Sequence, residues 1–382
     1  MKRKIVIACL GIDLSGGGAE RVQLTLLKLL NRDLFSVELA YLRDYGELGS
    51  LIPPDISPSF FTNDKTRFRS AIATDLRKYR AIARRADILF GMVEAIPIYM
   101  ASLIGALDKK PSIGWNHTTN SRSLVNFLSP HRILMPLLYP RVSQMVCVSD
   151  GARTDLMSLY SFKNNTPITI YNPLDIDAIQ FLGAQPLPEV AQSWYKRPTV
   201  IGVGRLVALK RTDLLIQSFA SAIRNGLDAN LIILGDGPLL HRLQKLTDEL
   251  GITSRVFFAG FVSNPYPYIK AASVLAMSSD YEGLGMVLLE AMALGTPVVS
   301  VDCPNGPREI LQGGANGILT PLSDSDALAV SIASMLRDDD ARRTYVKSGL
   351  TRIEDFRCTL IVQQFERLFL RLVDNTSAFH HT

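Results

Sequence analysis

The stretch that decides the fold of this chain is SVLAMSSDYEGLGMVLLEAMALGTPVVSVD, residues 273–302. SVLAMSS is an apolar run typical of a buried strand, DYEGLG has the composition of a turn, and MVLLEAMALG predicts a helix that ends at Gly295. PVVSVD then predicts a second buried strand. Apolar strands joined by a helix are typical of a parallel sheet that is covered on both faces.

The same alternation of short apolar runs and helical patterns extends in both directions along the chain. Two such series predict an α/β protein with two doubly wound domains. The predicted strands lie at 4–10, 36–42, 86–92, 111–116, 144–150 and 168–172, and again at 199–204, 230–236, 256–261, 273–278, 297–302 and 317–320.

The domain boundaries follow from composition. Residues 1–182 are expected to form an N-terminal Rossmann-like domain, and residues 199–354 a C-terminal Rossmann-like domain. Between them, GAQPLPEVAQSWYKRP (183–198) is rich in proline and polar residues and is expected to be a linker. Residues 355–374 have helical periodicity and predict a C-terminal helix that could pack back on the N-terminal domain.

Length and composition indicate a globular protein with two cores. The chain has 382 residues, of which 47% are hydrophobic and 20% are charged. Its four cysteines are far apart in the sequence and have no metal-ligand spacing. Cys9 and Cys147 lie inside apolar runs, so we expect buried, reduced thiols and a cytoplasmic protein. The first apolar run stops at Asp13 without a small-residue cleavage site and predicts a strand rather than a secretory signal. No apolar run reaches the roughly 18–20 residues that span a bilayer.

The net charge of +5 is concentrated in the first half, where residues 1–190 contain 22 Lys and Arg against 17 Asp and Glu. Residues 65–85 hold eight basic residues and one acid at helical spacing. This segment is either a solvated surface helix or a helix on anionic lipid, where each basic side chain could contribute about 1 kcal/mol. The apolar segment 123–141 is similarly either a membrane contact or a buried helix and turn. No nucleic-acid reader motif is present, so a nucleic-acid partner is not expected.

Candidate functional residues follow the predicted strands, where open α/β sheets bind their ligands. Three glycines at 16–18 precede a helix and predict either a phosphate-binding loop or an ordinary tight turn. Arg205 and Lys210 follow another strand, with Asp213 near the start of the next helix. These two cations either neutralise a diphosphate or form a solubilising surface pair. The turn in LGDGP at 234–238 is given no catalytic role.

Glu282 and Glu290 are eight positions apart across the glycine-rich turn of the opening stretch. If both were helical, they would lie near the same face, about two turns apart. A carboxylate can accept two hydrogen bonds from vicinal hydroxyls such as those of ribose, and the alternative is a pair of solvent-facing glutamates. Asp175 and Asp177 form a DxD string, which could hold a metal ion, but their position after Asn172-Pro173 favours helix capping.

The motifs GGGAERV, GRLVALKRTDLLI, LGDGP, FAGFVSN and EGLGMVLLEAMALGTPVVSVDCPNGPREIL resemble those of the retaining GT-B glycosyltransferases grouped as family 4. LLYPRVSQMVCVSDGARTDL and TIYNPLDID resemble the end of that family's first domain, so the resemblance covers nearly the whole chain. It implies a GT-B fold, in which two doubly wound, Rossmann-like domains face each other across a cleft. In that fold residues 1–182 would be the acceptor-side domain, and residues 199–354 would bind the nucleotide sugar. The DCPNGPREIL variant is similar to that of bacterial enzymes that build polysaccharide or lipid-linked glycans.

The resemblance also implies roles for individual residues. Arg205 and Lys210 match the pair that holds the donor diphosphate, Glu282 matches the acid near the reacting sugar, and Glu290 matches the acid on the ribose hydroxyls. His117 matches a position next to the donor sugar. The implied catalytic residues are therefore Arg205, Lys210, Glu282 and His117, with Asn116 as a neighbour, and the implied donor-binding residues are Gly17, Gly18, Gly283, Leu284, Gly285 and Glu290.

The implied activity is transfer of a hexosyl or N-acetylhexosaminyl group from a nucleotide sugar, expected to be a UDP-sugar, to a lipid-linked or glycan acceptor. Cations and backbone amides would stabilise the leaving nucleotide, so neither a metal nor another cofactor is expected. The implied partners are the donor, a lipid-linked acceptor and an anionic membrane surface on the cytoplasmic side. A non-hydrolysing UDP-sugar epimerase and a non-catalytic nucleotide-sugar-binding subunit remain alternatives. Arg211 and Leu284 depart from the family's usual Gly and Phe, which affects the expected sugar preference.

Overall fold

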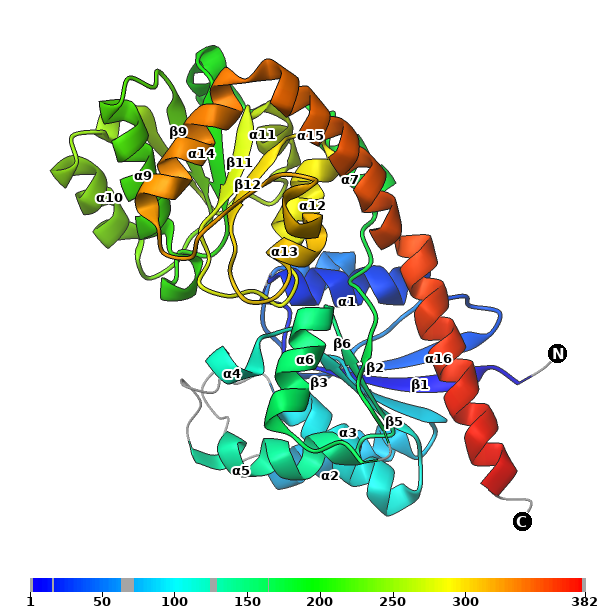
Figure 1. The fold of residues 1–382 in the computed structure, drawn as a ribbon. Helices are drawn as coiled ribbons and strands as arrows, with labels where there is room; N and C mark the ends of the chain where they lie inside the picture. Colours follow the sequence, from blue (N-terminus) through cyan, green and yellow to red (C-terminus); the bar gives the residue numbers. More distant parts are fainter. Residues whose placement is uncertain (1–2, 16, 63–71, 124–128, 164, 380–382) are drawn as a thin grey trace. The chain divides into compact units, whose positions relative to one another are not determined.

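The computed structural model describes residues 3–15, 17–62, 72–123, 129–163 and 165–379 (Figure 1). The chain divides into two compact units. Unit 1 contains Met1–Pro173 and Cys358–Thr382, and unit 2 contains Leu174–Arg357.

Unit 1 is built on a seven-stranded sheet in the order β3-β2-β1-β4-β5-β6-β7, and all of its strand pairs are parallel. Parallel strands need a crossover between each pair, and helices provide most of the crossovers here. The strands are β1 (Ile5–Gly11), β2 (Phe35–Arg43), β3 (Ser59–Thr62), β4 (Ile88–Gly91), β5 (Ser112–Asn116), β6 (Gln144–Cys147) and β7 (Ile168–Thr169). The helices are α1 (Gly18–Leu29), α2 (Ile72–Ala83), α3 (Ile96–Asp108), α4 (Asn120–Ser123), α5 (Ser129–Leu138), α6 (Asp150–Leu159) and α16 (Cys358–Phe379), with a 3-10 helix η3 (Tyr139–Arg141).

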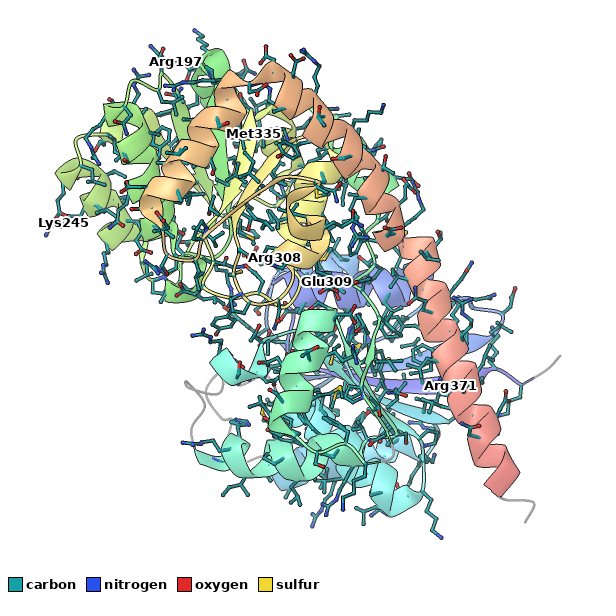
Figure 2. All side chains as sticks on the ribbon, in the orientation of Figure 1. Arg197, Lys245, Arg308, Glu309, Met335 and Arg371 are labelled. Carbon is teal, nitrogen blue, oxygen red and sulfur yellow. The ribbon has the colours of Figure 1, made fainter. Side chains whose placement is uncertain are left out.

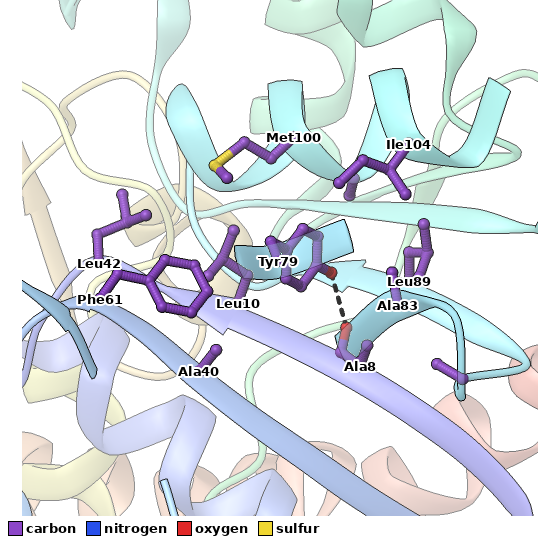
Figure 3. Close-up of a cluster of buried hydrophobic side chains, with 12 residues drawn as sticks. Ala8, Leu10, Ala40, Leu42, Phe61, Tyr79, Ala83, Leu89, Met100 and Ile104 are labelled. Atoms are coloured by element: carbon purple, nitrogen blue, oxygen red, sulfur yellow. Dashed lines mark hydrogen bonds between the residues drawn. The ribbon is translucent and has the colours of Figure 1, made fainter. Parts of the chain in front are cut away.

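Two groups of helices cover the two faces of this sheet. Helices α2 and α3 pack over one face, where the core contains Leu10, Leu42, Phe61 and Met100 (Figure 3). Within this core the hydroxyl of Tyr79 donates to the carbonyl of Ala8 at 2.9 Å, which satisfies its polar atom.

Helices α1 and α16 cover the other face. The buried side of α16 packs against α1 and β4. Phe365 lies with its ring centroid 4.8 Å from that of Trp115, and Phe369 contacts Phe35 at 5.8 Å. Further along the helix lies Arg371 (Figure 2), which donates to Gln144 at 3.3 Å. The helix expected at 355–374 is therefore α16, and it belongs to unit 1 although it follows unit 2 in the sequence.

Unit 2 is built on a six-stranded parallel sheet in the order β10-β9-β8-β11-β12-β13. Helix α9 packs against α10 and α14, while α12 packs against α7, α11 and α15. The strands are β8 (Thr199–Val203), β9 (Asn230–Leu234), β10 (Val256–Gly260), β11 (Val274–Met277), β12 (Val298–Val301) and β13 (Ile318–Thr320). The helices are α7 (Ile176–Gly183), α8 (Glu189–Gln192), α9 (Thr212–Arg224), α10 (Leu240–Glu249), α11 (Tyr266–Ala271), α12 (Met286–Ala293), α13 (Pro307–Ile310), α14 (Ser325–Arg337) and α15 (Asp339–Arg352), with 3-10 helices η4 (Ser193–Lys196) and η5 (Ala208–Lys210).

The predicted fold class is confirmed, because both units are Rossmann-like parallel sheets between helices. Each strand predicted from the sequence is present within a few residues of its expected bounds, and β3 was not predicted. The four cysteines are buried and free, as expected for Cys9 and Cys147.

The division between the units differs from the one expected at 182 and 199, because residues 174–198 belong to unit 2. Helix α7 packs against α11 and α12. In the segment expected to be a linker, the indole of Trp194 stacks on Phe257 with ring centroids 5.3 Å apart. The next residue, Tyr195, donates its hydroxyl to the carbonyl of Tyr268 at 2.8 Å. These two aromatic contacts make the expected linker an ordered part of unit 2.

Candidate active site

In unit 2 the predicted residues lie where the strand order reverses, which we call the switch point of the sheet. Strand β8 leads to β9 on one side, and β11 returns to pair with β8 on the other side. Such a reversal leaves a crevice beyond the carboxyl ends of the two strands. Arg205 and Lys210 follow β8 and Glu282 follows β11, so the fold brings both segments to this crevice although they are far apart in sequence.

Lys210 and Glu282 form an ion pair there, with Nζ and Oε1 2.6 Å apart. The two side chains are mostly buried, with 26% and 12% of their surfaces exposed. Backbone contacts join the same two loops, because Asp280 N donates to Leu209 O at 2.9 Å and Ser278 Oγ donates to Lys210 O at 3.0 Å. The sequence predicted both charged residues at the site but did not predict that they pair with each other.

Arg205 lies on the same loop as Lys210 and is exposed. The LGDGP turn supports this loop from the side of β9. Leu206 N donates to Asp236 O at 2.9 Å, and a Cβ added to Gly235 would lie 2.0 Å from the carbonyl oxygen of Gly204. Glycine therefore lets the two backbones touch. The sequence assigned this motif only to a turn, and the glycines on both sides of Asp236 were the signal for the closer packing.

Arg211 occupies a position where the family pattern usually has glycine. Its backbone is left-handed, with φ 46° and ψ 42°, a conformation that glycine adopts at little cost. Its guanidinium donates to Asp213 at 3.2 Å and to Asp280 at 3.1 Å, and the hydrogen bond to Asp213 is the main cause that raises the pKa of Arg211. Two carboxylates thus hold an arginine where the family usually has glycine. Asp213 lies in the first turn of α9, as expected.

The EGLG turn connects β11 to α12. Helix α12 begins at Met286, so Glu282 precedes the helix and only Glu290 is helical. The expected two-turn relation between the glutamates therefore does not apply. Gly285 caps the helix with φ 91°, and Leu284 is 2% exposed. Gly283 belongs to the same turn, and Glu290 is half-buried on α12.

The loop after β12 packs onto the EGLG turn. Glu282 N donates to Pro304 O at 3.2 Å, and a Cβ on Gly306 would lie 1.9 Å from Leu284 O. Arg308, which follows on α13, pairs with Asp302 at the end of β12 (Figure 2). The DCPNGPREIL motif therefore supports the backbone that carries Glu282.

In unit 1 the glycine loop lies between β1 and α1. Gly17 is the N-cap of α1 with φ −73°, a value that any residue can adopt. A Cβ on Gly17 would meet a carboxylate oxygen of Glu20, and a Cβ on Gly18 would meet nothing within 4 Å. Among the described residues, neither backbone conformation nor backbone packing requires glycine at 17 and 18. Gly16 lies outside the described residues.

His117 follows β5 in unit 1. Its Nε2 donates to Met92 O at 3.1 Å, and its ring centroid is 4.4 Å from that of Trp115. The buried Nδ1 has no hydrogen-bond partner among the described residues. Burial lowers the pKa of His117 to about 3, so the imidazole is neutral at pH 7 and its Nδ1 can only accept a hydrogen bond. Asn116 is buried, and its amide donates to Thr118 O at 2.9 Å.

Sequence reasoning missed Glu94, which follows β4 and pairs with the turn that carries His117. The amide of His117 donates to Glu94 Oε1. Burial is the main cause that raises the pKa of Glu94 to about 7, against the opposing effect of backbone amides. A carboxylate directly after an apolar strand was the available signal.

In the DxD string, the predicted capping role is confirmed for Asp175. Asp175 is the N-cap of α7 and accepts from Ala178 N at 3.1 Å. Asp177 forms an ion pair with Arg357 at 3.3 Å. In the described part of the chain, no group of three or more His, Cys, Asp or Glu residues could hold a metal ion.

Part of the basic segment 65–85 is described as helix α2. Arg80 forms an ion pair with Asp108, and Lys78 donates to Phe61 O, so these two cations are used inside unit 1. Arg77, Arg84 and Arg85 are exposed, and residues 65–71 lie outside the described part. Among the described residues, no helix is both long and apolar enough to cross a bilayer.

Comparison with known proteins gives the same picture for both units. The family model for Glycosyltransferase Family 4 matches residues 16–178, and that for Glycosyl transferases group 1 matches residues 188–352. A Campylobacter jejuni protein named N-acetylgalactosamine-N,N'-diacetylbacillosaminyl-diphospho-undecaprenol 4-alpha-N-acetylgalactosaminyltransferase is 30% identical over 361 residues. The match covers 90% of this chain and 93% of that protein. The chain therefore belongs to the family 4 glycosyltransferases.

Further relatives agree. The lipopolysaccharide core biosynthesis glycosyltransferase LpsE of Rhizobium meliloti is 36% identical over 152 residues, which cover 40% of this chain and 43% of LpsE. The crystal structure of Anabaena HepE in complex with UDP and glucose has a TM-score of 0.80 at 21% identity and covers 96% of this chain and 100% of HepE. At that identity the likeness shows the fold alone, which is GT-B.

Proposed function

We propose that this glycosyltransferase moves a hexosyl or N-acetylhexosaminyl group from a UDP-sugar to a lipid-linked glycan, with retention of the anomeric configuration and without a metal. The observation that carries the proposal is the pairing of Lys210 with Glu282 at the switch point of unit 2. It sets a cation and a carboxylate side by side at the position where α/β sheets bind nucleotides. The names of the Campylobacter and Rhizobium relatives and the UDP in HepE support the choice of acceptor and nucleotide.

The chemistry assigned to unit 2 is stabilisation of the leaving group. As the sugar–phosphate bond breaks, negative charge grows on the departing UDP, and Lys210 and Arg205 stabilise it. Amides of the Gly283–Gly285 turn contact the phosphate and sugar, and Glu290 accepts hydrogen bonds from the ribose hydroxyls. Glu282 balances the charge of Lys210. Binding of the diphosphate therefore shifts Lys210 from its carboxylate to the phosphate oxygens.

The acceptor hydroxyl attacks on the same face from which the nucleotide leaves, and its proton passes to the leaving phosphate. This route retains the configuration and needs no protein base. In unit 1, the open space at Gly18 suits a phosphate at the start of α1, and the neutral His117 suits a sugar hydroxyl rather than a charged group. The comparisons do not favour an epimerase or a non-catalytic binding subunit.

A lipid-linked acceptor requires access to a bilayer surface, and unit 1 has exposed apolar side chains suited to it. Helices α3 and α5 pack against each other. Ile133 and Leu137 on α5 are 66% and 47% exposed, and Leu107 on α3 is 62% exposed. Arg132 on α5 and Lys109, the C-cap residue of α3, are also exposed. We assign α3 and α5 to the cytoplasmic face of the membrane. Helix α2 is the weaker candidate, because Lys78 and Arg80 already bind groups inside unit 1.

The experiment that tests the proposed function is a nucleotide-release assay over UDP- and GDP-sugars, with membrane lipid extract as acceptor and with or without a chelator. We expect UDP release that requires lipid extract and that the chelator does not change. NMR of the product should show the anomeric configuration of the donor. Release from no nucleotide sugar, or inversion, would contradict the proposal. Co-sedimentation with anionic vesicles should fall in the double variant Ile133→Ser with Leu137→Ser, whereas Leu159→Ser, on α6, serves as the control.

A further inference from the structure

The strand ends of unit 1 contain a carboxylate that the proposed mechanism does not use. Glu94 follows β4, next to β1 and β5 in the sheet, so it lies at the switch point of unit 1. It is half-buried, and its Oε1 accepts the amide of His117. A half-buried carboxylate that accepts a backbone amide is a connection between two strand ends rather than a solvated surface charge.

The backbone next to Glu94 is strained. Ala95 has φ 63° and ψ −116°, a combination that residues with a side chain rarely adopt. The strained peptide is held in place, because Ala95 N donates to the hydroxyl of the buried Tyr139 at 2.9 Å. Strain of this kind persists where the surroundings over-determine it, and it is concentrated at functional sites.

The turn that Glu94 contacts is fixed from its other side as well. Asn116 donates to Thr118 O at 2.9 Å, and Asn120 donates to Asn116 Oδ1 at 2.7 Å. The ring of His117 is held by Met92 O. These contacts hold the carbonyl of Thr118 and the side chains of Asn116 and His117, and Glu94 supplies the contact to the His117 amide.

We propose that Glu94 is a positioning residue for sugar transfer: its carboxylate fixes the backbone of the His117–Thr118 turn, and it acts on the reaction through that turn. This inference rests on the proposed function, which places His117 next to the donor sugar. A displacement of about 1 Å at a positioning group can cost about 100-fold in rate. Positioning also explains why a strained backbone is retained beside the carboxylate.

The same carboxylate makes the positioning depend on pH. Its pKa of about 7 is raised by burial and, to a smaller extent, by the carboxylate of Glu20 on α1. Tyr139 and Cys147 also face it from η3 and β6, and burial raises the pKa of both, so they are neutral near pH 7. His117 is neutral as well. Protonation of Glu94 near pH 7 therefore weakens the acceptor of the His117 amide.

The test compares Glu94→Gln and Glu94→Ala in the full-length chain by UDP release. Glutamine keeps an oxygen that accepts an amide, so we expect a loss in kcat of about threefold to tenfold, whereas alanine should lose about 100-fold with a small change in KM. As the pH increases, the kcat of the wild type should rise with an apparent pKa near 7. The kcat of Glu94→Gln should not show this rise. The exposed Glu47→Gln serves as the control.

Three kinetic results would overturn the proposal. These are a kcat for Glu94→Ala within twofold of wild type, a Glu94→Gln variant as inactive as Glu94→Ala, and a pH transition that persists in Glu94→Gln. The second result would make Glu94 a proton-transfer group instead.

A second measurement does not depend on activity. Hydrogen exchange of the 116–120 amides should be faster in Glu94→Ala than in Glu47→Gln, and unchanged exchange would contradict the positioning role even if no donor sugar is found. Tyr139→Phe, which removes the acceptor of the Ala95 amide, should accelerate the same amides. Tyr160→Phe is its matched control, because among the described residues its hydroxyl donates to Met135 Sδ, at 3.5 Å, and to no backbone atom, although it belongs to the same core cluster. If Glu94→Ala fails to fold, hydrogen exchange of the 116–120 amides in folded Tyr139→Phe still tests the proposal.

Discussion

The switch points of the two units hold their charges in different ways. In unit 2, Lys210 and Glu282 from neighbouring strand ends neutralise each other directly. In unit 1, backbone amides hold the carboxylate of Glu94, and the nearby His117 is neutral. A cation that can exchange a carboxylate for a phosphate suits a nucleotide diphosphate, whereas a neutral imidazole and a fixed backbone suit hydroxyl groups. The same fold thus provides two chemically distinct strand ends.

The largest expected effect tests the exchangeable cation of unit 2. Lys210→Ala should lower kcat by about 10²–10³-fold, because it removes a group that stabilises the developing charge on the leaving nucleotide. Arg205→Ala should have an effect of similar size, and circular dichroism should show that both variants are folded. Lys245→Ala, at an exposed lysine of α10, is the matched control. Near-normal rates in both Lys210→Ala and Arg205→Ala would remove the basis for the diphosphate role.

The second prediction concerns the backbone support of the unit 2 loop. Gly235→Ala places a Cβ against the backbone of Gly204, so the loop of Arg205 must move. We expect a loss of about 3 kcal/mol or more in the free energy of unfolding, as for other overpacked sites with added backbone strain. Gly226→Ala also has a positive φ but an open surrounding, and it should lose only about 1 kcal/mol. Equal losses in urea unfolding would show that the contact between the two loops is unimportant.

Features that depend on local sequence could be predicted, whereas contacts between residues far apart in the sequence could not. The strands could be predicted because their apolar runs are continuous, and Lys210 and Glu282 because they lie just after such runs. The ion pair between them joins residues 72 positions apart, so no local pattern shows it. Similarly, the segment 183–198 resembles a linker until Trp194 meets Phe257, which comes from another part of the sheet. Glu94 belongs to no motif, and its importance appears only when the 117–118 turn folds onto it.

The third prediction uses pH to compare two groups within unit 1. The folded pKa of His117 is lowered from 6.5 to about 3, so the unfolded chain binds its proton first and this group makes stability fall as pH falls from 6.5. The folded pKa of Glu94 is raised from 4.5 to about 7, so this group makes stability rise as pH falls from 7 to 4.5. Between pH 6.5 and 5 the two contributions oppose each other.

Single variants should expose each contribution. Relative to wild type, Glu94→Gln should lose about 2 kcal/mol more in the free energy of unfolding between pH 6.5 and 5, and His117→Gln should gain about as much. Urea titrations at several pH values measure both differences. Parallel pH profiles for the two variants would show that these groups do not titrate as their burial implies.

The smallest expected effects come from a residue with positive φ at each switch point. Ala95 in unit 1 and Arg211 in unit 2 both adopt backbone conformations that favour glycine. Ala95→Gly should raise the free energy of unfolding by about 1 kcal/mol, because the strain is relieved and only a methyl group is lost. Arg211→Gly relieves similar strain but also removes two partly exposed ion pairs, each worth about 0–1 kcal/mol, so its net change should be near zero. High salt screens those ion pairs, so the free energy of unfolding of Arg211→Gly relative to wild type should be higher at high salt than at low salt. The difference between Ala95→Gly and wild type should not change with salt. If both variants respond to salt alike, the carboxylates of unit 2 do not hold Arg211, and the contrast between an ion-paired and a backbone-held switch point loses one of its supports.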